Sequence, residues 1–513
     1  MRIGVDVGGT NTDAVIMNGR EVLHGVKSAT TEEPGLGIIN AVSDILEKTK
    51  ISPNDLESVM IGTTQFTNAF VENKRLEEVA IVRLAYPATI SVPPCIDFSD
   101  NLRNILGNNF WIVPGGYEFD GRYLGDWSET EIEKVAKEIS QKKLKYISIS
   151  CVFSPINEKQ EILTADIIKK YNPESIITMS HRIGRVGFIE RENATIMNSS
   201  LGNLADKVIT SFNEALIKLN IKCPFYISQN DGTLMSANIV KNYPVLTFAS
   251  GPTNSMRGAA FLSGHKNAIV VDIGGTTTDF GVIKEGFPRE SAIPVDIGGV
   301  RTNFRMPDLI SIGLGGGSLV TNVNNNIEVG PESVGFKLTS ESLIFGGNKL
   351  TASDIAIAKG LSNFGNKDNV SNLDKNLIDN TIIKIKKMIE DGIDRVKLNK
   401  DLVPVILVGG GSILVEGNLE GAEEVIIPKH SDVANAIGAS LAQAGGEIDK
   451  IYSYNEIGRD KSIENAKNDA INRALQAGAI KETISIIELE EIPLSYLPSG
   501  AVRLHVKAVG DIF

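Results

Sequence analysis

Short apolar runs alternate, along the first part of the chain, with longer stretches that carry an apolar residue at every third or fourth position. The short runs predict buried strands, and the longer stretches predict amphipathic helices. Strands are expected at 3–5, 14–16, 21–27 and 59–62, with a helix that begins at Pro34 before the last of them. Three strands, a helix and a further strand predict an α/β half with a mixed sheet.

The alternation continues beyond a stretch at 91–126 that is rich in proline and glycine, which we expect to be an irregular surface insertion. A long helix is expected to run from a polar cluster near residue 190 to about Leu219. The chain beyond residue 446 predicts a small α+β appendage. The other expected helices are at 129–141, 158–171, 432–444 and 463–476, and the other expected strands at 146–153, 175–179, 224–228, 403–408, 483–489 and 501–509.

Length and composition limit the architecture and the class of protein. At ~150 residues per domain, a chain of 513 residues is expected to hold about three domains. We place them at 1–185, 186–445 and 446–513. The formal net charge of −12 argues against a non-specific nucleic-acid binder, because such proteins present a basic surface to the phosphates.

The cysteines and the apolar runs bear on the cellular compartment. Cys95, Cys151 and Cys223 are far apart, so they favour neither a disulfide framework nor a paired-cysteine zinc site. Met1 leads within two residues into a predicted strand, and no run of about 18 apolar residues occurs. We therefore expect a cytoplasmic protein with neither a secretory leader nor a membrane anchor.

One eight-residue pattern occurs twice. The first copy reads Asp6-Val7-Gly8-Gly9-Thr10-Asn11-Thr12-Asp13, and the second reads Asp272-Ile273-Gly274-Gly275-Thr276-Thr277-Thr278-Asp279. The copies are identical at six positions, and each lies between two apolar runs. Each copy therefore predicts a tight turn between two buried strands.

The residue types in this pattern suit a phosphate and its metal ion. Adjacent glycines let backbone N–H groups converge on an anion, and the threonine hydroxyls add donors. Asp6 and Asp272 end the first strand of each pair, where a carboxylate can hold the water shell of a magnesium ion. The alternative is a pair of ordinary glycine-rich hairpins, which the repetition disfavours.

Two other turns carry polar residues at the carboxyl ends of predicted strands, where open α/β sheets bind ligands. One contains Thr63, Thr64 and Asn68, and its alternative role is to cap a helix. The other contains Asn230 and Asp231, and its alternative is a common Asn-Asp-Gly turn.

A polar cluster and two triple glycines complete the candidates. Glu190 and Arg191 lie in the cluster that begins the expected long helix, where i to i+4 pairing on a solvated face is the alternative. Gly409, Gly410 and Gly411 follow a predicted strand, so a flat adenine ring could lie against their bare backbone. Neither this turn nor the one at 313–318 has the spacing of a Walker loop or a dinucleotide fingerprint.

Together these motifs resemble the hydantoinase/oxoprolinase A family, in the ATPase superfamily of actin, Hsp70 and sugar kinases. The resemblance extends from residue 1 to about 445. It implies two ribonuclease-H-like domains, at 1–185 and 186–445, around a nucleotide cleft. It rests on both Gly-Gly-Thr-x-Thr-Asp copies, Gly62-Thr63-Thr64 with Thr67-Asn68-Ala69, Glu190-Arg191, Asn230-Asp231-Gly232 with Leu234-Met235, Ser250-Gly251-Pro252, and Ile312-Gly313 with Gly315 to Ser318.

Members of that family use ATP to open cyclic amides such as hydantoins and 5-oxoproline, and others are ATP-handling subunits of ketone carboxylases. The resemblance therefore implies ring-opening hydrolysis of a cyclic amide, with ATP and Mg²⁺, through phosphorylation of the amide oxygen. Domain closure is the expected working motion. The alternatives are a ketone-carboxylase-like subunit, a small-molecule kinase of the same fold, and a sensor that uses ATP only to close its domains.

The resemblance also implies a role for each candidate residue. Asp6 and Asp272 would position the metal, and Asp13 or Asp279 would orient the acceptor or water. The implied phosphate and adenosine contacts are Gly8, Gly9, Thr10, Gly274, Gly275, Thr276, Gly409, Gly410 and Gly411. The implied substrate-side residues are Thr63, Thr64, Asn68, Glu190, Arg191, Asn230 and Asp231.

The chain departs from the family pattern at three points. Family members usually carry a histidine where this chain has Ile310-Ser311, and a Pro-Gly-Pro-Ala-Cys-Tyr stretch where it has residues 335–339. It is also shorter than the full-length enzymes. The substrate and the need for a B-type partner subunit therefore stay open, and a homodimer is also compatible with the sequence.

Overall fold

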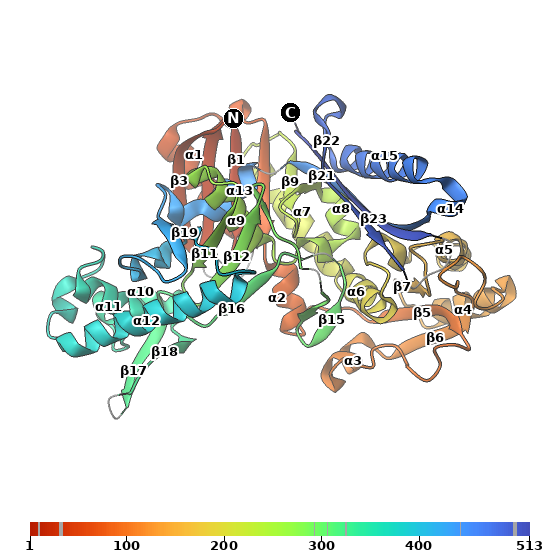
Figure 1. Cartoon of the computed structure of the whole chain (residues 1–513), viewed down its shortest axis with the longest axis horizontal. Coiled ribbons are helices and arrows are strands. Elements are labelled where there is room, and N and C mark those ends of the chain that lie inside the picture. The colour runs from red at the N-terminus through yellow and green to blue at the C-terminus, as the bar shows by residue number, and fades with distance from the viewer. Residues whose placement is uncertain are drawn as a thin grey trace.

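The computed structural model describes residues 1–8, 11–29, 34–291, 293–304, 306–323, 326–441, 443–495 and 500–512. A nine-stranded sheet and a six-stranded sheet form its centre, and a four-stranded sheet and a helical region lie toward opposite ends of the long axis (Figure 1). None of the helices in these ranges is long and apolar enough to cross a membrane.

The first sheet begins as the sequence pattern predicts. β1 (Arg2–Val7), β2 (Asn11–Asn18) and β3 (Glu21–Ala29) form an antiparallel meander, and β4 (Ser58–Thr63) pairs with β1 in parallel. The helix α1 (Pro34–Thr49) packs its apolar side chains into the same core as these strands. The carboxyl ends of β1 and β4 therefore lie at one edge of the sheet.

Strands from distant parts of the chain extend this sheet. β9 (Phe225–Ser228) pairs with β4 in parallel, and the order continues through β10 (Leu234–Ser236), β21 (Ala444–Ser453), β23 (Ala501–Gly510) and β22 (Ser485–Pro493). The tail is α+β as expected, but its strands join the first sheet, so the hydrogen-bonded sheet crosses the expected boundaries at 185 and 445. The local pattern of apolar residues predicts where a strand lies but not which strand it pairs with. The expected boundaries therefore did not anticipate this pairing.

The second sheet repeats the plan of the first. β11 (Ala268–Ile273) and β12 (Thr278–Lys284) form an antiparallel hairpin, and β19 (Val403–Val408) pairs with β11 in parallel. The long helix α12 (Lys375–Val396) packs Ile385, Ile389 and Ile393 into the core beneath these strands. The remaining strands of this sheet are β13 (Phe287–Pro288), β16 (Leu309–Ile312) and β20 (Ala422–Ile426).

Two helices join the large sheets. α9 (Ser250–Ser263) packs against β11, β12 and β19, whereas α13 (Ala434–Leu441) packs against β1, β2 and β4. Their backbones nearly touch, because a Cβ at Gly258 would lie 1.9 Å from the carbonyl oxygen of Ala434. The two sheets are therefore connected by a tightly packed helix pair (Figure 1).

The four-stranded sheet is parallel, in the order β6 (Asn109–Pro114), β5 (Val79–Tyr86), β7 (Tyr146–Cys151) and β8 (Ile176–Met179). β6 lies inside 91–126, so the expectation of an irregular stretch there was wrong for this strand. The reason is that β6 is an edge strand with mostly half-buried side chains, which weakens its apolar signal. 

The long helix expected to end near Leu219 is divided at Leu201 into α6 (Phe188–Ser200) and α7 (Gly202–Lys218). The other elements used below are α2 (Gln65–Val71), α3 (Asp100–Leu106), α4 (Glu129–Gln141), α5 (Lys159–Tyr171), α8 (Ala237–Asn242), α11 (Ala352–Lys359), α15 (Arg459–Ala477), β17 (Ser318–Val323) and β18 (Asn326–Ser333).

Candidate functional site

Each copy of the repeated pattern brings two carboxyl groups to one end of a hairpin. Asp6 lies opposite Asp13 in the β1–β2 pair, and Asp272 lies opposite Asp279 in the β11–β12 pair. Residues directly opposite in antiparallel strands have their Cβ atoms about 5 Å apart on the same face. Asp6 and Asp13 are only 4% and 3% exposed, so their charges are buried.

The two turns between these strands close in the same way. Gly8 N–H and Gly274 N–H each donate to the backbone carbonyl three residues ahead, at 3.0 and 2.9 Å. Gly9 and Thr10 lie outside the described residues. In the second turn, a Cβ at Gly275 would meet no atom within 4 Å, so this glycine borders open space, and Thr276 beside it is partly exposed.

The carboxylates of both hairpins influence one another. Burial raises the pKa of Asp6 to about 7. The charges of Asp13 and Asp272 also raise this pKa, whereas hydrogen bonds from neighbouring side-chain amides lower it. Burial raises the pKa of Asp279 to about 6, and the Asp272 charge again adds. The pKa of Asp272 is raised by burial and by Asp13. The two copies of the pattern therefore form one electrostatic cluster.

Two residues that the sequence pattern did not indicate hold the first pair of carboxylates. Asn435 of α13 donates to Oδ2 of both Asp6 and Asp13, at 3.0 Å each, and Lys27 of β3 donates to Asp13 Oδ2 at 3.0 Å. Oδ1 of each aspartate has no hydrogen-bond partner in the described part of the chain. Buried carboxylate oxygens without a donor fit a hard cation such as Mg²⁺.

The turn at 313–318 supports the second hairpin turn. Gly316 N–H donates to Gly274 carbonyl at 3.0 Å, and Gly317 N–H donates to Gly275 carbonyl at 2.8 Å. A Cβ at Gly315 would lie 2.5 Å from the Thr276 nitrogen. Glycines are therefore needed here because one backbone packs directly on another.

Ser311 belongs to the Ile310-Ser311 pair at which the sequence departs from the pattern that it resembles. It lies opposite Asp279 in the β12–β16 pair, and its hydroxyl lowers the pKa of that carboxyl by hydrogen bonding. This side chain is therefore next to the carboxylate cluster, although it cannot take up a proton as a histidine does.

The Gly409–Gly411 turn packs against the end of β11. Gly409 has φ +83°, and a Cβ there would lie 2.4 Å from Asp272 Oδ1, whereas a Cβ at Gly411 would lie 2.5 Å from the Ile273 side chain. Gly410 is exposed, and a Cβ there would meet no atom within 4 Å. Gly410 and Gly275 therefore leave room for a ligand at the carboxyl ends of the paired strands β19 and β11.

The Thr63 turn lies beside the first hairpin turn. Thr64 N–H donates to the Val7 carbonyl at 3.4 Å, and Asn68 Nδ2 donates to Thr64 Oγ1 at 3.4 Å. Thr63 is buried, and its hydroxyl accepts from Gln65 N–H at 3.3 Å, whereas the N-cap residue of α2 is Thr64, whose side chain makes no capping hydrogen bond. Thr64 and Asn68 stay partly exposed, so they are the better candidates for contact with a ligand.

The Glu190–Arg191 pair is placed differently. Arg191 is fully buried and donates to the carbonyls of Arg185, Val186 and Cys151 at 2.7 to 2.8 Å. Its contacts among the described residues thus hold the chain around α6 rather than either hairpin turn. Glu190 is partly exposed and lies 3.7 Å from the Arg301 guanidinium.

Asn230 and Asp231 follow β9 at the same sheet edge as Gly8 and Thr63. The Asn230 carbonyl accepts from Thr253 Oγ1 at 3.0 Å. Asp231 forms a buried ion pair with Lys507 of β23 at 2.8 Å. Burial lowers the pKa of Lys507, but the Asp231 and Glu290 carboxylates outweigh it and raise the pKa above its usual value.

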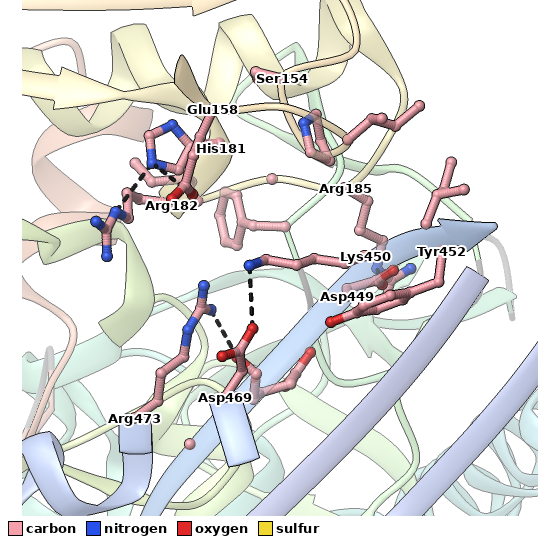
Figure 2. Close-up of a pocket in the computed structure, with 18 of the residues that line it drawn as sticks. Ser154, Glu158, His181, Arg182, Arg185, Asp449, Lys450, Tyr452, Asp469 and Arg473 are labelled. Carbon is pink, nitrogen blue, oxygen red and sulfur yellow. Dashed lines mark hydrogen bonds and ion pairs between the residues drawn. The ribbon is translucent and has the colours of Figure 1, made fainter. Parts of the chain in front are cut away.

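A cavity of about 790 Å³ begins at these residues. It lies between the segment after β8, strand β21 and helix α15, and Figure 2 shows His181, Arg182, Lys450, Asp469 and Arg473 around it. β21 hydrogen-bonds to β10 only at Ala444, so the rest of this strand edge borders the cavity. No signal in the sequence marks this cavity, because its walls come from many segments that lie far apart in the chain.

A second group of possible metal ligands lies on the C-terminal strands. Ligand atoms of Glu488, Glu490 and His505 lie within 4.8 Å of one another. His505 is fully buried. This group is separate from the aspartate cluster, since it lies on β22 and β23.

Two family models match the chain. The hydantoinase/oxoprolinase N-terminal region matches residues 2–172, and the hydantoinase/oxoprolinase model matches residues 191–397. The gap between them includes the segment before α6.

Two curated relatives are similar over much of the chain. The acetophenone carboxylase gamma subunit of Aromatoleum aromaticum is 24% identical over 70% of this chain and 53% of its own length. The caprolactamase subunit alpha of Pseudomonas jessenii is 24% identical over 70% of this chain and 54% of its own length. The matched region thus spans about half the length of these two relatives.

Solved structures show the same fold. The ATP-dependent caprolactamase of Pseudomonas jessenii superimposes with a TM-score of 0.80 at 18% identity, over 99% of this chain and 87% of that one. A nucleotide-free acetone carboxylase superimposes with a TM-score of 0.69 at 16% identity, over 100% of this chain and 88% of that one. The α/β fold expected from the sequence is confirmed, and the matches to both family models show that this chain belongs to the hydantoinase/oxoprolinase family.

Proposed function

We propose that this chain binds ATP with Mg²⁺ between the two hairpin turns and uses it to open a cyclic amide. The observation that carries the proposal is the facing carboxylate pair on each hairpin, Asp6 with Asp13, which are buried, and Asp272 with Asp279, which are half-buried. Such pairs are costly without a cation, and they lie beside turns whose backbone suits phosphate. The caprolactamase relative, which by its name acts on a lactam, supports a cyclic amide as substrate.

In the proposed reaction the amide oxygen attacks the γ-phosphorus, and the bond from that phosphorus to the bridging oxygen breaks to release ADP. A water molecule then adds to the activated carbon, and the C–N bond breaks as the nitrogen takes a proton. A second water molecule hydrolyses the resulting acyl phosphate to a carboxylate and phosphate. This sequence suits an amide, because its carbonyl is otherwise a poor electrophile.

The proposal assigns contacts with the metal ion, the phosphates and the adenosine to particular residues of this chain. Asp6 and Asp272 would hold Mg²⁺ through its waters, and the ion would neutralise phosphate charge when bound. The N–H groups of Gly8 and Gly274 close their own turns, so the backbone at Gly275 and Thr276 binds phosphate oxygens, and Gly410 faces the adenosine. Asn435 and Lys27 orient the first carboxylates.

Asp6→Asn and Asp272→Asn test this function. We expect each to lower ATP turnover by about 100-fold or more, since removing a group that stabilises transition-state charge costs about 10² to 10³ in rate. Wild type should show ATP hydrolysis that rises with one member of a panel of hydantoins and lactams. Asp391→Asn, on the exposed face of α12, is the matched control and should behave as wild type.

The assay should be run with and without a B-type subunit, because the acetophenone carboxylase and caprolactamase relatives are by their names subunits. ATP turnover within two-fold of wild type in Asp272→Asn would contradict the proposal. Accumulation of a phosphorylated substrate would instead support a kinase. Turnover that requires bicarbonate and a ketone would support the role of a carboxylase subunit, which the acetophenone carboxylase relative favours.

A further inference from the structure

The edge strand of the nine-stranded sheet carries two glutamates that face a histidine on the next strand. Glu490 of β22 lies directly opposite His505 of β23, and Glu488 lies two residues before Glu490, on the same face. The other face of β23 packs Leu504 and Val506 against α15. The three polar side chains therefore extend from the face of the sheet that α15 does not cover.

His505 is buried without a hydrogen bond. Its side chain has no exposed surface, and neither ring nitrogen has a hydrogen-bond partner in the described part of the chain. Nδ1 lies 3.9 Å from Glu488 Oε1 and 3.9 Å from Glu490 Oε2, and Nε2 lies 3.2 Å from Glu447 Oε1. A buried polar group without a partner is costly, so a ligand for this ring would stabilise the fold.

The two distances of 3.9 Å fit a shared ion better than a direct hydrogen bond. A hydrogen bond from a ring nitrogen to an oxygen is about 2.7–3.2 Å long. Zinc lies about 2.0–2.2 Å from nitrogen and carboxylate ligands, so two ligands of one ion lie up to about 4.2 Å apart. The three ligand atoms are within 4.8 Å of one another, so the largest adjustment that they need is about 0.6 Å.

The glutamates can make this adjustment, and an ion can reach them. The side chains of Glu488 and Glu490 are 37% and 50% exposed, so both can change their rotamers at the surface. The ring of His505 is held in place by the packing around it. The site thus has one fixed ligand and two adjustable ligands, with an open path from solvent.

The basic residues that flank His505 on this face of β23 pair with other carboxylates. Lys507 lies 2.8 Å from Asp231, and Arg503 donates to both oxygens of Asp449 at 2.7 and 2.6 Å. Neither of these two ion pairs includes Glu490. A divalent ion at Nδ1 would therefore add positive charge at the point where two carboxylates converge.

Glu447 would set the tautomer of the ring. A carboxylate beside Nε2 favours a proton on that nitrogen, so Nδ1 presents its lone pair to the two glutamates of β22. Histidines that bind metal ions commonly have their second nitrogen beside a carboxylate in this way. A mixed set of imidazole and carboxylate ligands suits Zn²⁺, whereas Mg²⁺ is bound through oxygen.

We propose that Glu488, Glu490 and His505 bind a divalent transition-metal ion, with Zn²⁺ as the ion that matches the ligands, and that this ion links the edge strand β22 to β23. Water completes the coordination, because the chain supplies three ligands. The site is distinct from the magnesium site of the proposed function, since it lies on other strands and includes a histidine. It does not depend on ATP hydrolysis.

Zinc binding to the full chain, after removal of metal ions, tests the proposal. Calorimetry with excess Mg²⁺, which fills a site made of oxygen ligands, should show one zinc ion per chain at the β22–β23 site. Glu490→Gln should weaken this binding by about ten-fold or more, since losing even an outer contact of a metal site costs about 10–100-fold. Glu482→Gln, in the exposed turn before β22, is the control and should bind zinc as wild type does.

Histidine variants identify the nitrogen ligand. His505→Asn should lose the same zinc ion, whereas His265→Asn should keep it, because His265 faces a single carboxylate, Glu424, at 3.6 Å. Should the buried change at His505 prevent folding, Glu490→Gln at the exposed edge decides the matter. Equal zinc affinity in Glu490→Gln and wild type would overturn the proposal, and so would equal competition by Mg²⁺.

Hydrogen exchange measures the link between the two strands. Zn²⁺ should slow exchange of the β22 amides in wild type and in Glu482→Gln, and should leave it unchanged in Glu490→Gln. Zinc binding without slower exchange in β22 would overturn the link. Failure of wild type to bind zinc would overturn the metal site and would favour a protonated His505 that pairs with the carboxylates around it.

Discussion

Burial governs the chemistry of the aspartates at the scale of single residues. Asp6 and Asp13 share Asn435 as a donor, and each keeps one carboxylate oxygen without a partner in the described structure. An ionised carboxylate in such a place loses its hydration, so the protonated form is favoured until a cation arrives. The same residues are thereby suited to couple metal binding to proton release.

This coupling predicts how stability depends on pH. The pKa of Asp6 is about 7 in the folded chain, against 3.8 for an aspartate that is free in water. Between these two pH values the folded state holds a proton that the unfolded state has lost, so stability should fall as pH rises from about 4 to about 7 and then level off. Melting curves in the presence of a chelator measure this fall.

Asp6→Asn provides the comparison for the pH series. Its melting temperature should fall less over the same interval, because the amide does not titrate. The stabilisation by Mg²⁺ and ATP should increase over this interval in wild type, since the metal binds the ionised carboxylate. Parallel pH curves for the two proteins would show that Asp6 does not carry the effect.

At the scale of elements, the contact between α9 and α13 connects the two halves of the site. α9 begins beside the Thr63 turn, where Ser250 Oγ donates to the Thr63 carbonyl at 3.3 Å, and α13 carries Asn435. Glycines allow the two helices to approach, since a Cβ at Gly438 would lie 1.8 Å from the Asn254 carbonyl oxygen. The position of Asn435 thus depends on close backbone contacts at the neighbouring residues Ala434 and Gly438 of α13.

Gly258→Ala should separate these helices. The added Cβ would lie 1.9 Å from the Ala434 carbonyl oxygen, and backbone cannot move aside as a flexible side chain does. Overpacking of this kind costs about 1–3 kcal/mol. We expect a melting temperature lower by several degrees and weaker binding of ATP with Mg²⁺, measured by thermal unfolding and calorimetry.

Ser263→Ala is a suitable control for that helix, because the Ser263 hydroxyl donates to Ala259 of its own turn at 2.7 Å. It should melt close to wild type and bind nucleotide normally. Normal nucleotide binding in Gly258→Ala would mean that the helix contact does not position Asn435.

At the scale of the whole molecule, buried charges connect the C-terminal strands to both large sheets. Lys507 of β23 lies 2.8 Å from Asp231, after β9, and 3.5 Å from Glu290, after β13. Arg185 lies 3.9 Å from the same Glu290 and 3.5 Å from Asp449 of β21. The C-terminal strands are therefore built into the region between the sheet edge and the cavity.

Lys507→Met tests this connection. It leaves Asp231 and Glu290 without their buried cation, and breaking a buried ion pair by removing one partner costs about 3–5 kcal/mol. We expect a melting temperature lower by several degrees, with partial recovery in the double variant Lys507→Met with Asp231→Asn. A double variant that melts lower than the single variant would contradict the pairing.

The strands, helices and hairpin turns were largely predictable from the sequence, because each depends on local pattern. The two Asp-x-Gly-Gly-Thr copies indicated both turns, and helix α4 was expected with the bounds that it has. β6 was not predicted, because the side chains of this edge strand are mostly half-buried and show no clear alternation of apolar and polar residues. The division of the long helix at Leu201 escaped it too, because apolar periodicity continues across the break.

By itself, the sequence thus determined the residue types at the two turns and the family that they indicate. Only the tertiary structure decided which residues complete the site, because Asn435 reaches Asp6 across 429 positions of the chain. It also placed Arg191 in a buried framework and joined the C-terminal strands to the first sheet. Such pairings depend on which elements meet in space, and short-range patterns of apolar and polar residues do not encode that choice.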